Sequence, residues 1–138
     1  MKSPLTVVEL DHVVLRCRQQ DRTLDFYTRV LGLREERRIA QIGLIQLRAG
    51  ASMIDLVPAV EPRVESGTNL DHFCLGIETD DLSSAISYLR TNSVEILGEP
   101  AIRYGARGMG NSIYVRDPEG NVIELKQTPS LKQAERGQ

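Results

Sequence analysis

The sequence predicts an α+β fold in which two β-α-β-β-β modules form a curved mixed sheet with the helices on its outer face. The first observation behind this prediction is a tripeptide, Leu-Asp-His, that ends at His12 and again at His72, 60 residues apart (72 − 12). The second is an acid that stands twice between isoleucine and leucine, as Asp55 and as Glu124, 69 residues apart (124 − 55). Repetition of this kind indicates a duplicated structural unit, and the longer second offset places an insertion at residues 104–110.

The first module begins with a predicted strand from Val7 to Cys17, in which the alternation of side chains gives His12 a buried position on the sheet. Asp21 is typical of a helix start, and Gly32 is typical of the residue after a helix end. Apolar residues at helical spacing lie between them, which predicts a short amphipathic helix. Three further strands are predicted at residues 34–40, 43–48 and 52–57.

The second module follows a linker at residues 59–69, in a stretch with proline, glycine and no apolar periodicity. A strand is predicted at residues 70–77, and a helix begins after Asp80 and Asp81. Its apolar stripe, which must lie against the sheet, consists of Leu82, Ala85, Ile86 and Leu89. Strands are then predicted at residues 94–97, 112–116 and 122–126, and the proline and glycine in residues 117–121 predict a tight turn between the last two.

The composition is that of a single soluble domain. The chain has 138 residues, which suffices for one core or for two half-domains that share a sheet. We expect one domain at residues 6–128, made of modules 6–58 and 70–128, and a polar tail at 129–138. The net charge of −2 is spread along the chain without a basic block, so nucleic acid is not an expected partner. No apolar run suggests a membrane span or a signal peptide, so the expected location is cytoplasmic.

The two repeated patterns supply candidate metal ligands. Histidine and carboxylate side chains bind divalent ions such as Ni, Zn, Co, Mn or Fe, and the repeat offers His12, Asp55, His72 and Glu124. A carboxylate at an otherwise apolar strand position must be paired, ligated or exposed on the concave face of the sheet. We therefore predict one divalent ion per site. Asp11 and the repeated Asp71 should point to the face opposite the histidines, and we interpret them as sheet or turn residues.

A second candidate feature is the segment from Arg103 to Gly110, which combines glycines with arginines. Arginine is suited to carboxylate and phosphate groups. We predict a mobile loop that binds an anionic substrate beside the metal, with Arg103, Arg107 and Asn111 as the substrate-binding residues. A solvated loop without this role is the alternative.

The chain resembles the vicinal oxygen chelate superfamily, which includes glyoxalase I, fosfomycin-resistance enzymes, extradiol dioxygenases and bleomycin-binding proteins. The resemblance covers residues 6–128. It rests on the two Leu-Asp-His starts, the helix end Phe26-Tyr27…Leu31-Gly32 and the ending Asp117-Pro118-Glu119-Gly120-Asn121-Val122-Ile123-Glu124. It implies that His12 and His72 are first-strand ligands and Glu124 the last-strand ligand, while Asp55 stands where glyoxalase I has a glutamate.

The resemblance implies a small-molecule substrate and, as the leading function, a metal-dependent lyase or isomerase of the glyoxalase I type. Such an enzyme chelates two adjacent substrate oxygens, stabilises an enediolate and moves a proton with Glu124 or Asp55 as the catalytic base. Without Asp55, two histidines and one carboxylate would suit a dioxygenase or an antibiotic-modifying enzyme. A drug-binding protein without catalysis is the third possibility. Small members of the superfamily also imply a homodimer whose sites combine the first half of one chain with the second half of another.

Overall fold

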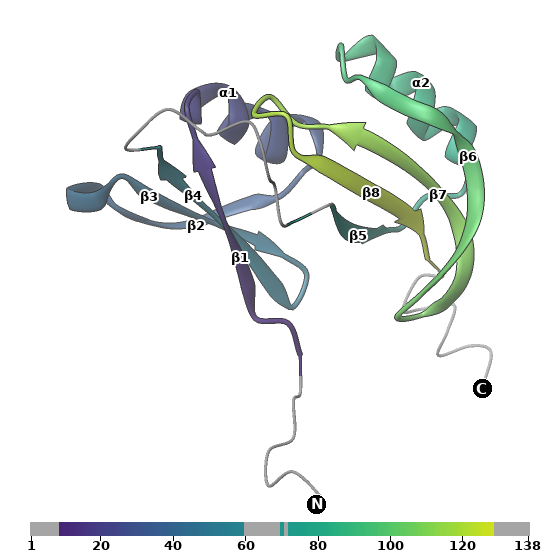
Figure 1. The fold of residues 1–138 in the computed structure, drawn as a ribbon, viewed down its shortest axis with the longest axis horizontal. Helices are drawn as coiled ribbons and strands as arrows, with labels where there is room; N and C mark the ends of the chain where they lie inside the picture. Colours follow the sequence, from purple (N-terminus) through teal and green to yellow (C-terminus); the bar gives the residue numbers. More distant parts are fainter. Residues whose placement is uncertain (1–8, 60–69, 71, 129–138) are drawn as a thin grey trace, which may run out of the picture. The chain divides into compact units, whose positions relative to one another are not determined.

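The computed structural model describes residues 9–59, 70 and 72–128, which form two compact units (Figure 1). The division between the units falls within residues 60–69. These residues, and with them nearly all of the predicted linker, lie outside the described part of the chain, as do Asp71, the first eight residues and the predicted tail. Each unit has the order β-α-β-β-β and forms its own four-stranded mixed sheet. The predicted α+β class and both predicted modules are confirmed, with the strands divided between two sheets.

The first unit contains strands β1 (His12–Cys17), β2 (Arg34–Ile39), β3 (Leu44–Ala49) and β4 (Ser52–Pro58). Helix α1 (Gln20–Asp25) continues as a π-helical turn (Phe26–Val30), and a 3₁₀ turn (Ala40–Ile42) joins β2 to β3. The strand order is β1-β4-β3-β2, with β1 parallel to β4 and the other neighbours antiparallel. This order places β4, which carries Asp55, between β1 and β3.

One face of the first sheet is apolar and buried. Its side chains come from β1, β3 and β4 and are Leu15, Cys17, Ile45, Leu47, Ile54 and Leu56. Phe26, Tyr27 and Val30 of the helical segment are buried as well, and Figure 1 shows this segment running along one side of the sheet. Because side chains alternate along a strand, the opposite face carries His12 and Asp55.

The helix of the first unit ends as the sequence predicts. Gly32 has a φ of +83°, which glycine adopts without the strain that a Cβ atom would cause. The Gly32 N–H donates to the Thr28 carbonyl (3.0 Å), and the Leu33 N–H donates to the Tyr27 carbonyl (2.8 Å), so both close the last turn. Asp21 lies in the first turn of α1, where an acid is favoured.

The second unit contains strands β5 (Phe73–Ile77), β6 (Ile96–Gly105), β7 (Gly108–Arg116) and β8 (Val122–Gln127), with helix α2 (Leu82–Thr91) between β5 and β6. The strand order is β5-β8-β7-β6, with β5 parallel to β8. The two units therefore have the same topology. In the second unit β8, which carries Glu124, takes the position that β4 has in the first.

The second core is built in the same way as the first. Its buried apolar residues are Ile113, Val115, Ile123 and Leu125 of the sheet, Leu82 and Leu89 of α2, and Val94. The ends of the predicted apolar stripe on α2 are thus buried. The predicted tight turn at residues 117–121 is also present, because the Asp117 carboxylate accepts the N–H groups of Glu119 (2.9 Å) and Asn121 (2.8 Å).

The stretch at residues 104–110 differs from the prediction. Instead of a loop, it is the end of a β-hairpin in which Arg103 pairs with Gly110 and Gly105 pairs with Gly108, so that Ala106 and Arg107 form a two-residue turn. Such short turns join antiparallel strands that continue their ladder to the end. The insertion therefore lengthens β6 and β7.

Among the described residues, no helix has the length and apolar character of a membrane span.

Candidate functional site

Glu124 lies in the middle of β8, and only 7% of its surface is exposed. A buried carboxylate is costly unless it is hydrogen-bonded, and strand β7 supplies the donors. The Ser112 hydroxyl donates to Oε2 (2.7 Å), and the Tyr114 hydroxyl donates to Oε1 at the longer distance of 3.3 Å. His72 Nε2 also lies 3.3 Å from Oε1. Oε2 therefore accepts the shorter of these hydrogen bonds, and the two contacts of Oε1 are longer.

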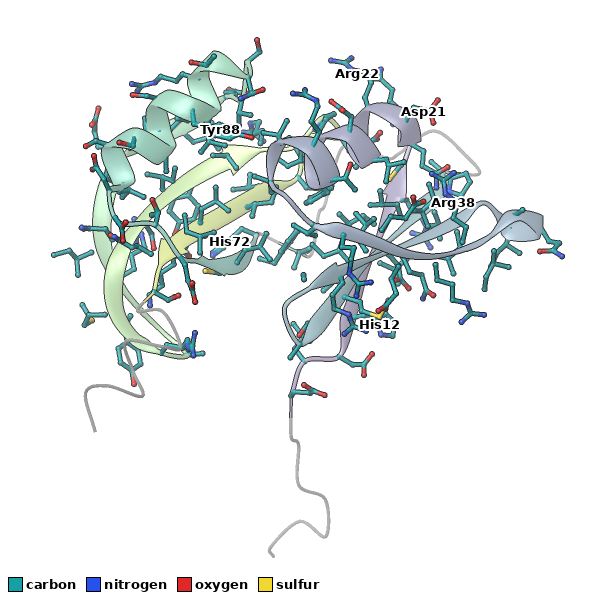
Figure 2. All side chains as sticks on the ribbon, turned by 180° about the vertical axis from the view of Figure 1, so that it is seen from behind. His12, Asp21, Arg22, Arg38, His72 and Tyr88 are labelled. Carbon is teal, nitrogen blue, oxygen red and sulfur yellow. The ribbon has the colours of Figure 1, made fainter. Side chains whose placement is uncertain are left out.

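His72 precedes β5 directly and lies on the same sheet face as Glu124. Cys74 is the residue of β5 opposite Glu124, and His72 stands two positions earlier, where the side chain points to the same side. The rings of His72 and Tyr114 meet edge to face, with centroids 5.3 Å apart, and the Arg103 guanidinium lies 5.1 Å from the Tyr114 ring centroid. Figure 2 labels His72 beside the strands of this unit.

Two weakly acidic groups beside Glu124 remain protonated at neutral pH. Surrounding protein atoms desolvate the Cys74 thiol, although part of this residue is exposed, and together with the charge of Glu124 they raise its pKa to about 11. The pKa of Tyr114 is raised for the same two reasons, against the opposing effect of Arg103. Tyr114 is therefore a hydrogen-bond donor to Glu124.

The first unit places Asp55 in an equivalent position on β4. Asp55 is buried, with 5% of its surface exposed, and both of its oxygens accept from Gln46 Nε2, at 3.2 Å and 3.4 Å. Val14 is the residue of β1 opposite Asp55, and His12 stands two positions before it on the same face. Asp55 and His12 are not directly bonded, but the charge of Asp55 raises the pKa of His12.

The environment of His12 differs from the prediction in two ways. We expected a buried histidine, but 47% of the His12 side chain is exposed, because it stands at the start of an edge strand (Figure 2). We also expected Asp11 to point away, but Asp11 Oδ1 lies 2.7 Å from His12 Nδ1, because Asp11 precedes the strand and does not follow its alternation. This hydrogen bond is the main reason that the pKa of His12 is raised. It leaves Nε2 as the nitrogen available to a ligand.

The two histidine–carboxylate pairs thus have the same register. In each unit the acid lies on the strand next to the first strand, and the histidine stands two positions before the residue opposite the acid. Gln46 and Tyr114, which contact the acids from the third strand, are directly opposite Asp55 and Glu124. Neither Gln46 nor Tyr114, nor Ser112, is among the site residues that the sequence predicts. Each of these residues is a polar side chain on a strand, which is a weak signal in the sequence. Only the strand register shows that it lies beside Asp55 or Glu124.

The donor atoms fit a divalent metal ion in part. Within the described residues no group of three or more histidine, cysteine or acidic side chains could hold a metal ion. The His72 nitrogen and the Glu124 oxygen are 3.3 Å apart, and two ligands at bond lengths of about 2.0–2.2 Å from one ion lie about 3–3.5 Å from each other. Each unit therefore offers one imidazole and one carboxylate, and a four-donor site requires both pairs.

The three predicted substrate-binding residues have different positions. Arg103 is directly opposite Gly110, on the face that carries Ser112, Tyr114 and Glu124. Arg107 is exposed in the hairpin turn. Asn111 is opposite Ile102 and therefore lies on the other face of the sheet. Among the three, only Arg103 shares the face of Glu124.

Comparisons with known proteins agree with this architecture. The model of the glyoxalase/bleomycin resistance protein/dioxygenase superfamily matches residues 9–125. A glyoxalase domain-containing protein of Mycosarcoma maydis is 32% identical over 93% of this chain and 73% of its own length. A lactoylglutathione lyase of Arabidopsis thaliana is 29% identical over 84% of this chain and 43% of its own length. The solved structure of an integron cassette protein from Vibrio cholerae has a TM-score of 0.69 and 32% identity, covering 91% of this chain and 98% of that one.

Proposed function

Since the chain belongs to the glyoxalase/bleomycin resistance protein/dioxygenase superfamily, we propose that it is a divalent-metal-dependent lyase of the glyoxalase I type that acts on a small substrate with two adjacent oxygens. The observation that carries the proposal is the matching register of His12 with Asp55 and of His72 with Glu124. The similarity to a lactoylglutathione lyase supports the reaction type, although this chain spans less than half of that protein.

The proposed ligands are His12, Asp55, His72 and Glu124. A bound divalent ion would act as a Lewis acid on two neighbouring substrate oxygens. Each unit provides only half of the donors, so we propose that the two pairs meet around one ion, and that they do so in a homodimer, between the first unit of one chain and the second unit of its partner.

Glu124 is the proposed proton carrier between two adjacent substrate carbons, with Asp55 as the second carboxylate in that role. The Ser112 hydrogen bond of 2.7 Å fixes Oε2, whereas the contacts of Oε1 with Tyr114 and His72 are longer, at 3.3 Å, and can be exchanged for a substrate proton. Tyr114 keeps its proton and so continues to orient the carboxylate during the reaction.

The test is metal analysis of protein purified without chelators, together with an assay of lactoylglutathione formation. Glu124→Gln should keep the fold and lower both metal content and turnover by at least about tenfold, because it removes an anionic ligand and the base. Glu99→Gln is the matched control, because Glu99 is an exposed acid of β6 in the same unit. Full metal content in Glu124→Gln would contradict the ligand set, whereas small-molecule binding without turnover would favour a binding protein.

A second candidate is a site of two histidines and one carboxylate, suited to a dioxygenase or to an antibiotic-modifying enzyme of the same superfamily. The observation in its favour is that Asp55 is buried and that both of its oxygens already accept from Gln46. The absorption spectrum of cobalt-substituted protein separates the two candidates. A changed spectrum in Asp55→Asn supports four ligands, and an unchanged spectrum with unchanged turnover supports three.

A further inference from the structure

Lys126 is a buried cation on the same sheet face as Glu124. It stands two positions after Glu124 on β8, and only 3% of its surface is exposed. Its side chain passes over two glycines of the hairpin. A Cβ atom at Gly105 would lie 3.3 Å from Lys126 Cδ and Cε, and one at Gly110 would lie 3.4 Å from Nζ. The absence of side chains at these positions lets the lysine lie along the sheet, with its ammonium between the two strands of the hairpin.

Arg103 brings a second cation to the same place. Arg103 is directly opposite Gly110 and two positions before Gly105. Its side chain therefore lies on the same sheet face as these two glycines, which contact Lys126. Its guanidinium lies over the Tyr114 ring, whose hydroxyl donates to Glu124. The two cations and the Glu124 carboxylate therefore border one continuous part of the sheet face.

Neither cation is neutralised by an acid. Among the described residues, the side chains of Lys126 and Arg103 form no salt bridge or hydrogen bond. In the described part of the chain, every side-chain nitrogen that is sealed from solvent has a hydrogen-bond partner, so Lys126 Nζ, which has none, reaches solvent. A charged group that is largely buried without an ion pair costs free energy. Such a cost is expected at a site where the charged group binds a ligand of opposite charge.

We propose that Lys126 and Arg103 form a subsite for an anionic group of the substrate, a carboxylate or a phosphate. The assignment rests on the proposed function in one respect, which is that the reacting atoms lie at Glu124. On β5, β7 and β8 the one carboxylate of the described residues on this face is Glu124, and neither Lys126 nor Arg103 forms a salt bridge with it. The substrate class is therefore a small molecule with an anionic group a few bonds away from its two adjacent oxygens.

The test is a titration of metal-free, ¹⁵N-labelled protein with inorganic phosphate, acetate and neutral acetamide. NMR shifts should saturate with the two anions at the amides of Gly105, Gly108 and Gly110 and should be absent with acetamide. The stronger of the two anions identifies the group. Arg103→Gln and Lys126→Met should each raise the Kd by about tenfold, the loss expected for one charge-assisted hydrogen bond. Arg103 is exposed, so its variant gives a result even if the lysine variant does not fold.

Arg90→Gln is the matched control, because it removes one positive charge from an exposed position on α2 in the same unit. Its Kd should be unchanged. An unchanged Kd in Arg103→Gln, or shifts scattered over other arginines, would overturn the subsite. The protein is metal-free in this experiment, so the result is independent of the metal. If the anions bind at the glycines but the protein takes up no divalent ion, the subsite is supported and the proposed metal-dependent function is contradicted.

Discussion

At the scale of single residues, Ser112 is the side chain that most directly fixes Glu124. Its hydroxyl is buried and donates the shortest hydrogen bond that the carboxylate accepts (2.7 Å). Ser112→Ala should lower the free energy of unfolding by about 1–3 kcal/mol, because a buried carboxylate oxygen loses its donor. Tyr114→Phe removes a contact of 3.3 Å and should have a smaller effect. Urea denaturation of both variants measures the difference, and equal losses would mean that the two donors are equivalent.

Asp25 gives a prediction of pH dependence. The hydrogen bond from Arg29 holds the pKa of Asp25 below its usual value of 3.8. A depressed pKa in the folded state contributes stability that is present above the unfolded pKa and is lost as the pH falls through the folded pKa. Wild type should therefore be slightly more stable than Asp25→Asn at pH 6, and the difference should begin to fall near pH 3.8 and disappear once the pH is below the lowered pKa of the folded state. Thermal melts at low and high salt measure it, and salt should reduce the difference because the pair is exposed.

The residues whose roles were missed share one physical feature. Gln46 and Tyr114 donate hydrogen bonds to Asp55 and Glu124 from the neighbouring strand. The Lys126 side chain packs against two glycines of the hairpin. Contacts of this kind depend on strand register, which side-chain alternation does not determine by itself. The acids were found because the repeat marks them twice, whereas their partners differ between the units and leave no repeated signal.

At the scale of the elements, helix α2 offers a local test of its predicted start. Asp81 is the N-cap, and its Oδ1 accepts the Ser83 N–H (3.0 Å), while Oδ2 accepts the Ser84 hydroxyl (2.9 Å). Asp81→Ala should lower the free energy of unfolding by about 1 kcal/mol, the usual cost of losing a cap. Asp80→Ala, one position earlier, should have almost no effect. Chemical denaturation compares the two, and equal effects would exclude a specific cap.

The helices and most strands could be predicted because their signals are local. The apolar stripe of α2 and the glycine after the first helix both follow from spacing along the chain. The β6–β7 hairpin could not be predicted in this way, because glycines and arginines at residues 103–110 are also typical of a loop. In the structure Gly110 is required by the Gln127 backbone oxygen of β8, which would lie 2.4 Å from a Cβ atom there, and Gly105 leaves room for the Lys126 side chain of the same strand. A contact with a later strand therefore decides the structure of this segment.

At the scale of the whole molecule, duplication is the property that the sequence predicts best. The two units have the same strand order, and their histidine–carboxylate pairs have the same register. The repeat of 60 residues between the histidines and of 69 between the acids is thereby explained, since the longer offset corresponds to the longer β6–β7 hairpin. The repeat does not indicate whether the proposed four-ligand site is formed by the two units of one chain or by units of two chains.

Mixing two variants tests whether the sites are shared between chains. His12→Ala removes a proposed ligand of the first unit, and Glu124→Gln removes a proposed ligand of the second. In a homodimer with shared sites, a hybrid of the two variants has one site with both defects and one site with none. Hybrid dimers should therefore recover one metal ion per dimer and about half of the wild-type turnover, whereas sites built within single chains recover neither. Native mass spectrometry identifies the hybrids and counts their ions. Hybrids that form but bind no metal, or a fully active monomer, would rule out the shared arrangement.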